Sequence, residues 1–177
     1  MPFRQVFLAL STLLSSSIVF AQPTFQDYPA PVYTGENHTV VLNNKTKLYK
    51  TLMTELSQQP VNFAGHYGIE LYGCGGGCVA GLLYDAQTGT TAYLPDAFRD
   101  CYSEQFGFSP RQIKYKLDSR LLIGTGTRTG NQQQCELVYY LIENGQFKEL
   151  KSYRINNGKN TWVNALFEEW ESEIDQW

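Results

Sequence analysis

The most unusual string in the chain is a cysteine–glycine run, Cys74-Gly75-Gly76-Gly77-Cys78. Glycine adopts positive φ angles without a side-chain penalty, so three glycines in a row permit a very tight turn. Such a turn can bring the two cysteine Cα atoms within the roughly 4.4–6.8 Å that a disulfide needs, which a straight strand would not do. We therefore expect Gly75, Gly76 and Gly77 to have a structural role in this loop.

The chain has four cysteines, which are Cys74, Cys78, Cys101 and Cys135. Residues 1–21 have the pattern of a secretion signal, and an even number of cysteines in an exported chain predicts disulfides rather than free thiols or metal ligands. The sequence leaves three connectivities open. If the first two pair and the last two pair, the chain-entropy model assigns about 2 kcal/mol to the small loop and about 4 kcal/mol to the large one. A redox dithiol and a zinc site are the alternatives. Thioredoxin-type motifs have two intervening residues and four-cysteine zinc sites have two tight pairs, so we expect neither metal nor cofactor.

Residues for acid–base or nucleophilic catalysis are few. The two histidines are His38 and His66, and no Gly-x-Ser-x-Gly motif is present. Residues four apart on a strand are separated by about 13 Å, so His66 and Glu70 do not form a direct acid–base dyad. We interpret His66 as a structural histidine that holds a neighbouring loop carbonyl, and we predict no catalytic residues. An enzyme that uses Glu70 or another carboxylate is the alternative.

Two segments carry candidate partner-binding residues. Between residues 95 and 112 aromatic side chains recur at spacings of four, which is typical of a short amphipathic helix over the core or of a recognition loop. The glycine- and threonine-rich segment 124–130 matches neither the dinucleotide nor the Walker pattern, and it predicts a loop between strands whose arginine contacts an anion or a partner. We expect the loops Arg99–Arg111 and Thr125–Gln134 to form the contact surface. The candidate contact residues are Tyr102, Phe106, Phe108, Ser109 and Arg128.

The elements that must position these residues are mostly strands. Apolar spacing over Lys45–Ser57, with Asn43 or Asn44 as cap, predicts a helix. Its apolar face would carry Leu48, Leu52, Met53 and Leu56. After Asn62 the period becomes two, and loops at Asp85–Gly89 and Asn144-Gly145 predict hairpins. The expected strands are 66–72, 78–85, 90–94, 112–117, 120–126, 135–142 and 146–155.

These patterns predict a mainly β protein. We expect antiparallel sheets, as a sandwich or blade-like sheets built from two similar hairpin units, with one N-terminal and one C-terminal helix. Residues 1–21 have the charge, apolar run and small-residue cleavage site of a secretion signal peptide. Residues 22–160 would form the disulfide-bonded β domain. Residues 161–177 would form a C-terminal helix with an acidic tail, which either docks on the domain or binds a partner.

Composition excludes several classes of function. The chain is 42% apolar, 18% charged and has a formal net charge of −3, which argues against intrinsic disorder. It has no basic excess to neutralise phosphates, so we expect no nucleic-acid partner. The apolar stretch near the start is too short to span a bilayer, so we expect no stable membrane insertion after signal cleavage.

Three motifs resemble a group of small secreted proteobacterial proteins. They are Asn62-Phe63-Ala64-Gly65-His66-Tyr67, Gly73-Cys74-Gly75-x-x-Cys78 and Asp85-x-x-Thr88-Gly89. The resemblance covers Asn62–Leu94 well and Cys101–Leu150 loosely, and it brings no established catalytic residues. In size, export and disulfide content the chain is also similar to periplasmic immunity proteins, which neutralise type VI secreted cell-wall effectors, and to lysozyme inhibitors.

These observations lead to one expected function and one alternative. We expect a periplasmic or secreted, non-enzymatic binding protein of the immunity type, whose partner is a cell-envelope-targeted hydrolase or toxin. The alternative is a protein that binds a cell-envelope glycan or another small ligand, which the 12 tyrosines favour.

Overall fold

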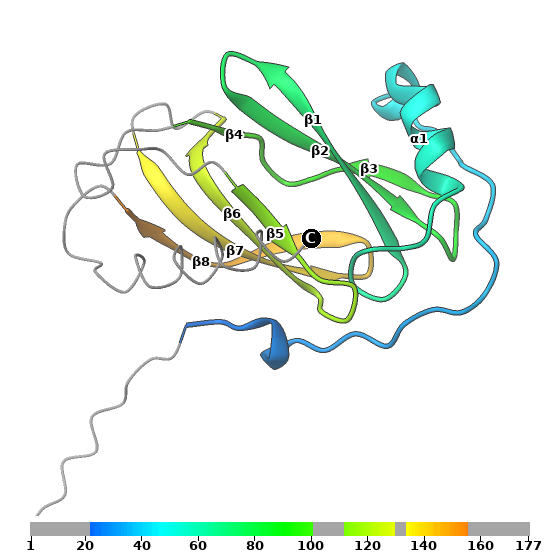
Figure 1. Ribbon diagram of the computed structural model, residues 1–177, viewed down its shortest axis with the longest axis horizontal. Coiled ribbons are helices and arrows are strands. Elements are labelled where there is room, and N and C mark those ends of the chain that lie inside the picture. The colour runs from blue at the N-terminus through cyan, green and yellow to red at the C-terminus, as the bar shows by residue number, and fades with distance from the viewer. Residues whose placement is uncertain (1–21, 101–111, 130–133, 156–177) are drawn as a thin grey trace, which may run out of the picture.

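The computed structural model describes residues 22–100, 112–129 and 134–155. These residues form one antiparallel sheet of eight strands and one short α-helix (Figure 1). The strands are β1 (Tyr67–Gly75), β2 (Cys78–Asp85), β3 (Thr91–Tyr93), β4 (Phe98–Arg99), β5 (Gln112–Tyr115), β6 (Leu121–Arg128), β7 (Cys135–Glu143) and β8 (Gln146–Arg154). The predicted mainly β, antiparallel class is therefore confirmed.

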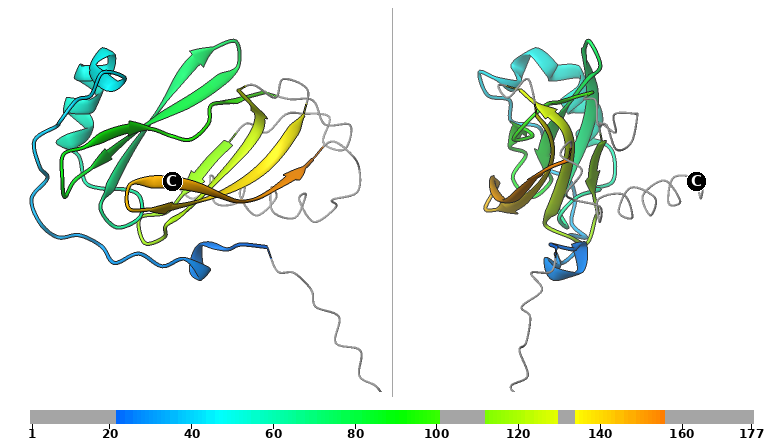
Figure 2. Two further views of the ribbon diagram at one scale, coloured as in Figure 1. Left: turned by 180° about the vertical axis from the view of Figure 1, so that it is seen from behind. Right: turned by 90° about the vertical axis from the view of Figure 1, so that its left-hand side faces the viewer.

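The sheet has two halves that the short strand β4 joins. The strand order is β1-β2-β4-β6-β7-β8, with β3 also paired to β2 and β5 also paired to β6. In β4, Phe98 lies opposite Val79 of β2 on one side and Arg128 of β6 on the other. Figure 2 shows the strong twist between the β1–β2 end and the β7–β8 end. The finer prediction of a sandwich or blade-like sheets is not confirmed, because β4 makes the two halves one continuous sheet.

Clusters of buried apolar side chains pack on both faces of this sheet. One cluster joins the two halves, and it includes Phe63, Ile69, Leu83, Phe98, Leu122, Val138 and Ile142. On the opposite face a second cluster lies over β6 and β7, and a third lies between the helix and β2. Residues 121–127 of β6 are consequently all buried, so this strand lacks the polar–apolar alternation of a strand with one wet face.

The predicted N-terminal helix consists of a 3₁₀ turn, η2 (Thr46–Tyr49), followed by α1 (Lys50–Ser57). The Asn43 side-chain oxygen accepts hydrogen bonds from the amides of Lys45 and Thr46 at 2.9 and 3.1 Å, as a cap should. Leu56 packs in the core, but Leu48 is 84% exposed. The prediction for Leu48 is wrong because this residue lies in the 3₁₀ turn, whose three residues per turn rotate it away from the apolar face.

The predicted loop after β2 and the predicted turn between β7 and β8 are also found in the structure. The Asp85 carboxylate accepts a hydrogen bond from the Gln87 amide at 2.9 Å in the loop after β2. Asn144 and Gly145 join β7 to β8 with φ angles of 50° and 74°, as a two-residue type I′ turn requires. A second 3₁₀ turn, η1 (Phe25–Asp27), lies near the start of the described chain. The predicted signal peptide and C-terminal helix lie outside the described residues, and no helix within them is long and apolar enough to cross a membrane.

Candidate functional site

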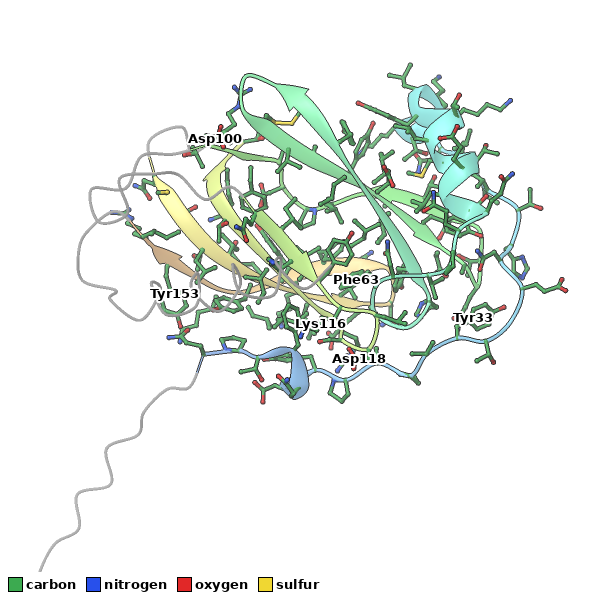
Figure 3. All side chains as sticks on the ribbon, in the orientation of Figure 1. Tyr33, Phe63, Asp100, Lys116, Asp118 and Tyr153 are labelled. Atoms are coloured by element: carbon green, nitrogen blue, oxygen red, sulfur yellow. A yellow bond between two sulfur atoms is a disulfide. The ribbon has the colours of Figure 1, made fainter. Side chains whose placement is uncertain are left out.

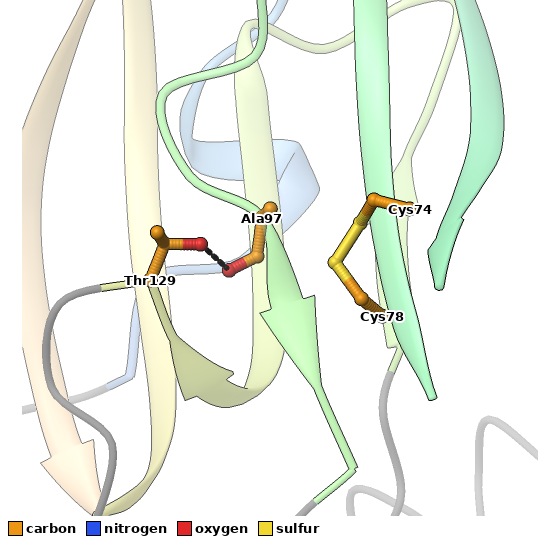
Figure 4. Close-up of a disulfide and its surroundings, with 4 residues drawn as sticks. All are labelled: Cys74, Cys78, Ala97 and Thr129. Atoms are coloured by element: carbon orange, nitrogen blue, oxygen red, sulfur yellow. Dashed lines mark hydrogen bonds between the residues drawn. A yellow bond between two sulfur atoms is a disulfide. The ribbon is translucent and has the colours of Figure 1, made fainter. Parts of the chain in front are cut away.

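The glycine run forms the tip of the β1–β2 hairpin. Gly76 and Gly77 are the two turn residues, and their φ angles of +54° and +71° are those of a type I′ turn. Gly75 has a φ of +85° beside a register shift in β1, which is the positive-φ geometry of a glycine bulge. The turn brings the Cα atoms of Cys74 and Cys78 to 5.0 Å, and the two residues form a disulfide (Figure 4). All three glycines thus have the structural role that their spacing predicts.

This tip is open to solvent. Residues 73–76 are all exposed, and a Cβ atom added to Gly73 or Gly75 would meet no atom within 4 Å. Cys78, by contrast, is buried, so the disulfide links the exposed tip to the core side of β2. Figure 1 shows this end of the hairpin extending beyond the neighbouring strands. The tip is therefore a rigid, exposed element with no side chain between its two cysteines.

Two charged residues at the end of β4 lie against the tip. The amide of Asp100 donates a hydrogen bond to the Gly77 carbonyl at 3.0 Å. A Cβ atom at Gly77 would collide with the Asp100 carboxylate, and one at Gly76 would lie 3.6 Å from an Arg99 guanidinium nitrogen. Both Arg99 and Asp100 are exposed, and Figure 3 shows Asp100 beside the hairpin end. The tip consequently presents a glycine backbone flanked by one positive and one negative group.

The strand register aligns this site with the second pair of cysteines. Cys78 lies opposite Arg99, Arg99 lies opposite Thr127, and Thr127 lies opposite Cys135, so one row of residues crosses four strands. Cys135 is also disulfide-bonded, whereas Cys101 lies outside the described residues. Next to this row, the amide and the hydroxyl of Thr129 both donate to the Ala97 carbonyl, and Figure 4 marks the bond from the hydroxyl. Three of the four cysteines therefore lie at one end of the sheet.

The predicted contact loops both begin at this end. Arg99 precedes the first loop. For the second, the prediction of a loop is wrong up to Arg128, because residues 124–128 pair with β7 and β5 or β4 as the end of strand β6. Four of the predicted contact residues, Tyr102, Phe106, Phe108 and Ser109, lie outside the described residues. For Phe98, the alternative of an amphipathic helix is wrong: this residue is buried in β4, where it pairs with strands on both sides.

Arg128, the fifth predicted contact residue, is engaged within the chain. Its guanidinium donates to Glu136 and Glu149 at 2.7 Å each and lies 3.7 Å from Asp96. Burial acts to lower the pKa of Arg128, but its hydrogen bonds to these glutamates and to Tyr140 outweigh burial and raise that pKa. The Tyr140 hydroxyl donates to Asp96, and burial and this carboxylate raise the Tyr140 pKa. Sequence reasoning missed this cluster because its members are up to 53 residues apart, and only strand pairing brings them together.

His66 lies at the other end of β1. Its Nε2 atom is 3.9 Å from the Asp85 carboxylate, and its ring packs on Tyr67 with 4.1 Å between centroids. These contacts differ from the loop carbonyl that we predicted as its partner. His66 also lines a cavity of about 430 Å³, together with the ion pair Arg120–Glu143. Glu70 lies within β1 opposite Leu82.

Motif residues around His66 hold the backbone in place. The Asn62 side chain accepts from the Ile69 amide at 2.8 Å and donates to the Ile69 carbonyl at 3.0 Å. Gly65 has a φ of +80°, and a Cβ atom there would collide with the Pro31 carbonyl. These positions are explained by folding rather than by chemistry.

Within the described ranges no three His, Cys, Asp or Glu side chains are grouped so as to hold a metal ion. Comparisons with protein-family models, curated proteins and solved structures found no match. The resemblance to small secreted proteins therefore rests on the three motifs alone, and it stays a prediction.

Proposed function

We propose that this protein is an exported inhibitor of the immunity type, which binds a cell-envelope-targeted hydrolase or toxin through the tip of its β1–β2 hairpin. The observation that carries the proposal is the Gly73–Gly77 tip, which is exposed at residues 73–76, closed by the Cys74–Cys78 disulfide and flanked by Arg99 and Asp100.

Rigidity of the tip supports a binding role. An interface loop that is mobile before binding must be ordered in the complex, which costs about 0.5–1.5 kcal/mol for each immobilised side chain. Here the disulfide, the type I′ turn and the hydrogen bond from Asp100 to Gly77 fix the loop beforehand. The binding free energy from contacts with a partner is therefore not reduced by the cost of ordering this loop.

The shape and charge of the tip favour a cleft-shaped partner surface. Between the cysteines only glycine backbone is present, so the tip is thin and can enter an opening that would exclude larger residues. Arg99 and Asp100 lie at its base, where opposite charges on a partner would set orientation and specificity more than affinity.

Disulfide bonding supports export. Cys74, Cys78 and Cys135 are all disulfide-bonded, and such bonds form and persist mainly in the periplasm and outside the cell. The sequence of residues 1–21 gives the same indication through its signal-peptide pattern. On these two grounds we propose that the mature protein is located in the periplasm or outside the cell.

Inhibition assays with blocked variants test the proposal. The probes are purified peptidoglycan-cleaving enzymes, including lysozymes, a lytic transglycosylase and an amidase, acting on isolated cell walls. Gly73→Arg places a long side chain in open space at the tip, where it should not disturb the fold. Gln146→Arg also adds an arginine at an exposed position, but beside the Asn144-Gly145 turn at the opposite end of the sheet, so it is the matched control.

We expect the wild type and Gln146→Arg to inhibit at least one enzyme equally, and Gly73→Arg to raise the inhibition constant at least about tenfold, which corresponds to 1.4 kcal/mol. Inhibition that survives Gly73→Arg unchanged would remove the tip from the interface. If the wild type inhibits none of these enzymes and protects no cell exposed to an envelope toxin, the proposed function is wrong.

A further inference from the structure

We propose that the surface on either side of the Tyr93 ring is a binding site for a neutral saccharide chain. This site goes beyond the proposed inhibitor function, because the glycines of the hairpin tip and the residues Arg99 and Asp100 do not line it. Two of its tyrosines, Tyr72 and Tyr93, pack in the cluster between α1 and β2.

Two cavities meet at Tyr93. The first has a volume of about 410 Å³, and its lining includes Tyr72, Tyr93, Asp96 and Thr129. The second has a volume of about 580 Å³ and lies between Tyr93 and the segment that precedes η2, with Asn43 in its wall. Both volumes are within the range of about 300–1,000 Å³ that is usual for ligand sites. Because Tyr93 lines both cavities, a ligand that occupied both would have to be elongated and would pass over this residue.

The tyrosine rings are held in fixed positions. The Tyr93 hydroxyl donates to the Lys45 carbonyl at 2.9 Å, and the Tyr49 ring meets the Tyr93 ring edge-on at 5.9 Å. Tyr49 also packs against Tyr72 with 4.9 Å between ring centroids. Burial and a hydrogen bond with Tyr49 raise the pKa of Tyr72, so its hydroxyl stays protonated well above neutral pH. The site is therefore preformed.

The chemistry of the lining selects a saccharide. A sugar ring has an apolar C–H face, which suits the electron-rich face of a tyrosine, and hydroxyl groups at its edge, which need polar partners. Around Tyr93 three side chains that are held by bonds within the chain have further capacity: Asn43 donates to the Thr91 carbonyl and has a second amide N–H, the Thr129 hydroxyl donates to Ala97 and can still accept, and Asp96 accepts from Tyr140 through one of its two oxygens. A purely apolar ligand would cover these remaining donors and acceptors without replacing the water that they bind.

Charge selects a neutral saccharide over an acidic one. Asp96 belongs to the cluster in which one arginine, Arg128, faces three carboxylates, so the cluster has an excess of negative charge. The Asp96 oxygen near Arg128 also accepts the Tyr140 hydroxyl, which holds the carboxylate at the edge of the first cavity. Acidic sugars would be repelled there, whereas neutral hydroxyls can donate to a carboxylate.

Titration of the full mature chain with N-acetylglucosamine oligomers tests the proposal. Nuclear magnetic resonance follows the amides of Tyr72, Tyr93 and Ala97, and oligogalacturonate is the acidic comparison. We expect saturable shifts with the neutral oligomers and a weaker response to the acidic ones. Tyr93→Ala should lower the association constant at least about fivefold, whereas Tyr93→Phe, which keeps the ring, should stay within about twofold.

The outcomes separate this site from the hairpin tip. Tyr93→Ala should leave hydrolase inhibition unchanged, since Tyr93 is not part of the tip. No saturable binding of neutral oligomers up to about 10 mM would overturn the proposal. So would equal binding by Tyr93→Ala and wild type, provided that circular dichroism shows both to be folded. Either result would leave the proposed inhibitor function untouched.

Discussion

The amide of Asp100 donates a hydrogen bond to the carbonyl of Gly77, and this 3.0 Å contact ties the end of β4 to the hairpin tip. Arg99, one residue earlier, pairs with Cys78 on the same hairpin. The tip is thus held twice, by a disulfide within the hairpin and by a neighbouring strand. Predictions about this end of the sheet follow from that double attachment.

Replacing both tip cysteines by serine should destabilise the protein moderately. The chain-entropy model assigns about 2 kcal/mol to the closure of so short a loop. We expect Cys74→Ser/Cys78→Ser to fold, with a free energy of unfolding lower by about that amount in urea titrations. A loss above about 4 kcal/mol, or none, would mean that the disulfide does not act by restricting the unfolded chain.

Alanine at Gly76 should cost more than alanine at Gly73. Gly76 has a φ of +54°, and an L-residue in this region costs about 1–2 kcal/mol. Gly73 has no positive φ and open space around it, so Gly73→Ala should change the free energy of unfolding by less than about 0.5 kcal/mol. Thermal and urea unfolding of the two variants measure the difference, and equal losses would contradict the turn geometry.

Removing the Arg128 charge should be strongly destabilising. Arg128→Met leaves Glu136, whose side chain is only 8% exposed, without its ion-pair partner. We expect a loss of about 2–4 kcal/mol in the free energy of unfolding. Arg120→Met is the matched control, because the Arg120–Glu143 pair is well exposed and should contribute less than about 1 kcal/mol. If both variants lost the same stability, the cluster would have no special role.

Stability should fall at alkaline pH because of buried tyrosines. Burial and the Asp96 carboxylate raise the folded-state pKa of Tyr140 above its unfolded value of about 10. The contribution of Tyr140 to the free energy of unfolding is therefore complete below about pH 10. It is lost as the pH rises, since the unfolded chain then releases a proton that the folded chain retains. The free energy of unfolding should decrease by up to about 1.4 kcal/mol per pH unit for each such tyrosine.

Tyr140→Phe should make this alkaline decrease shallower. The variant loses the hydroxyl that donates to Asp96, so its stability at neutral pH should also be lower, by about 1 kcal/mol. Urea titrations between pH 8 and about pH 11 give both quantities. Identical slopes for the variant and the wild type would show that Tyr140 ionises at the same pH in both states.

Local signals in the sequence predicted the turns and most strands. Asn144-Gly145, the Gly75–Gly77 run and the Asn43 cap act through bonds to residues that are close in the chain, so their outcome depends little on the rest of the fold. Leu48 was predicted wrongly because a 3₁₀ turn replaced the first turn of the helix.

Features that depend on strand pairing could not be predicted. β4 has only two residues, Phe98 and Arg99, which is too short to show an alternation of polar and apolar side chains. It nevertheless joins the two halves into one sheet. The ring of Phe98 lies where a Cβ atom at Gly124 would be, a contact between residues 26 positions apart. The partners of Arg128 are equally distant in sequence. The tip was recognised from its cysteines and glycines, but its neighbours Arg99 and Asp100 became visible only through the register.

Hydrogen exchange in a complex tests the central claim most directly. The full mature chain is compared, alone and bound to the hydrolase that it inhibits, by mass spectrometry of its peptides. We predict added protection in peptides that cover Gly73–Cys78 and Arg99–Asp100, and none around the far turn at Asn144–Gly145. Protection confined to the far turn, with unchanged exchange at the tip, would contradict the account.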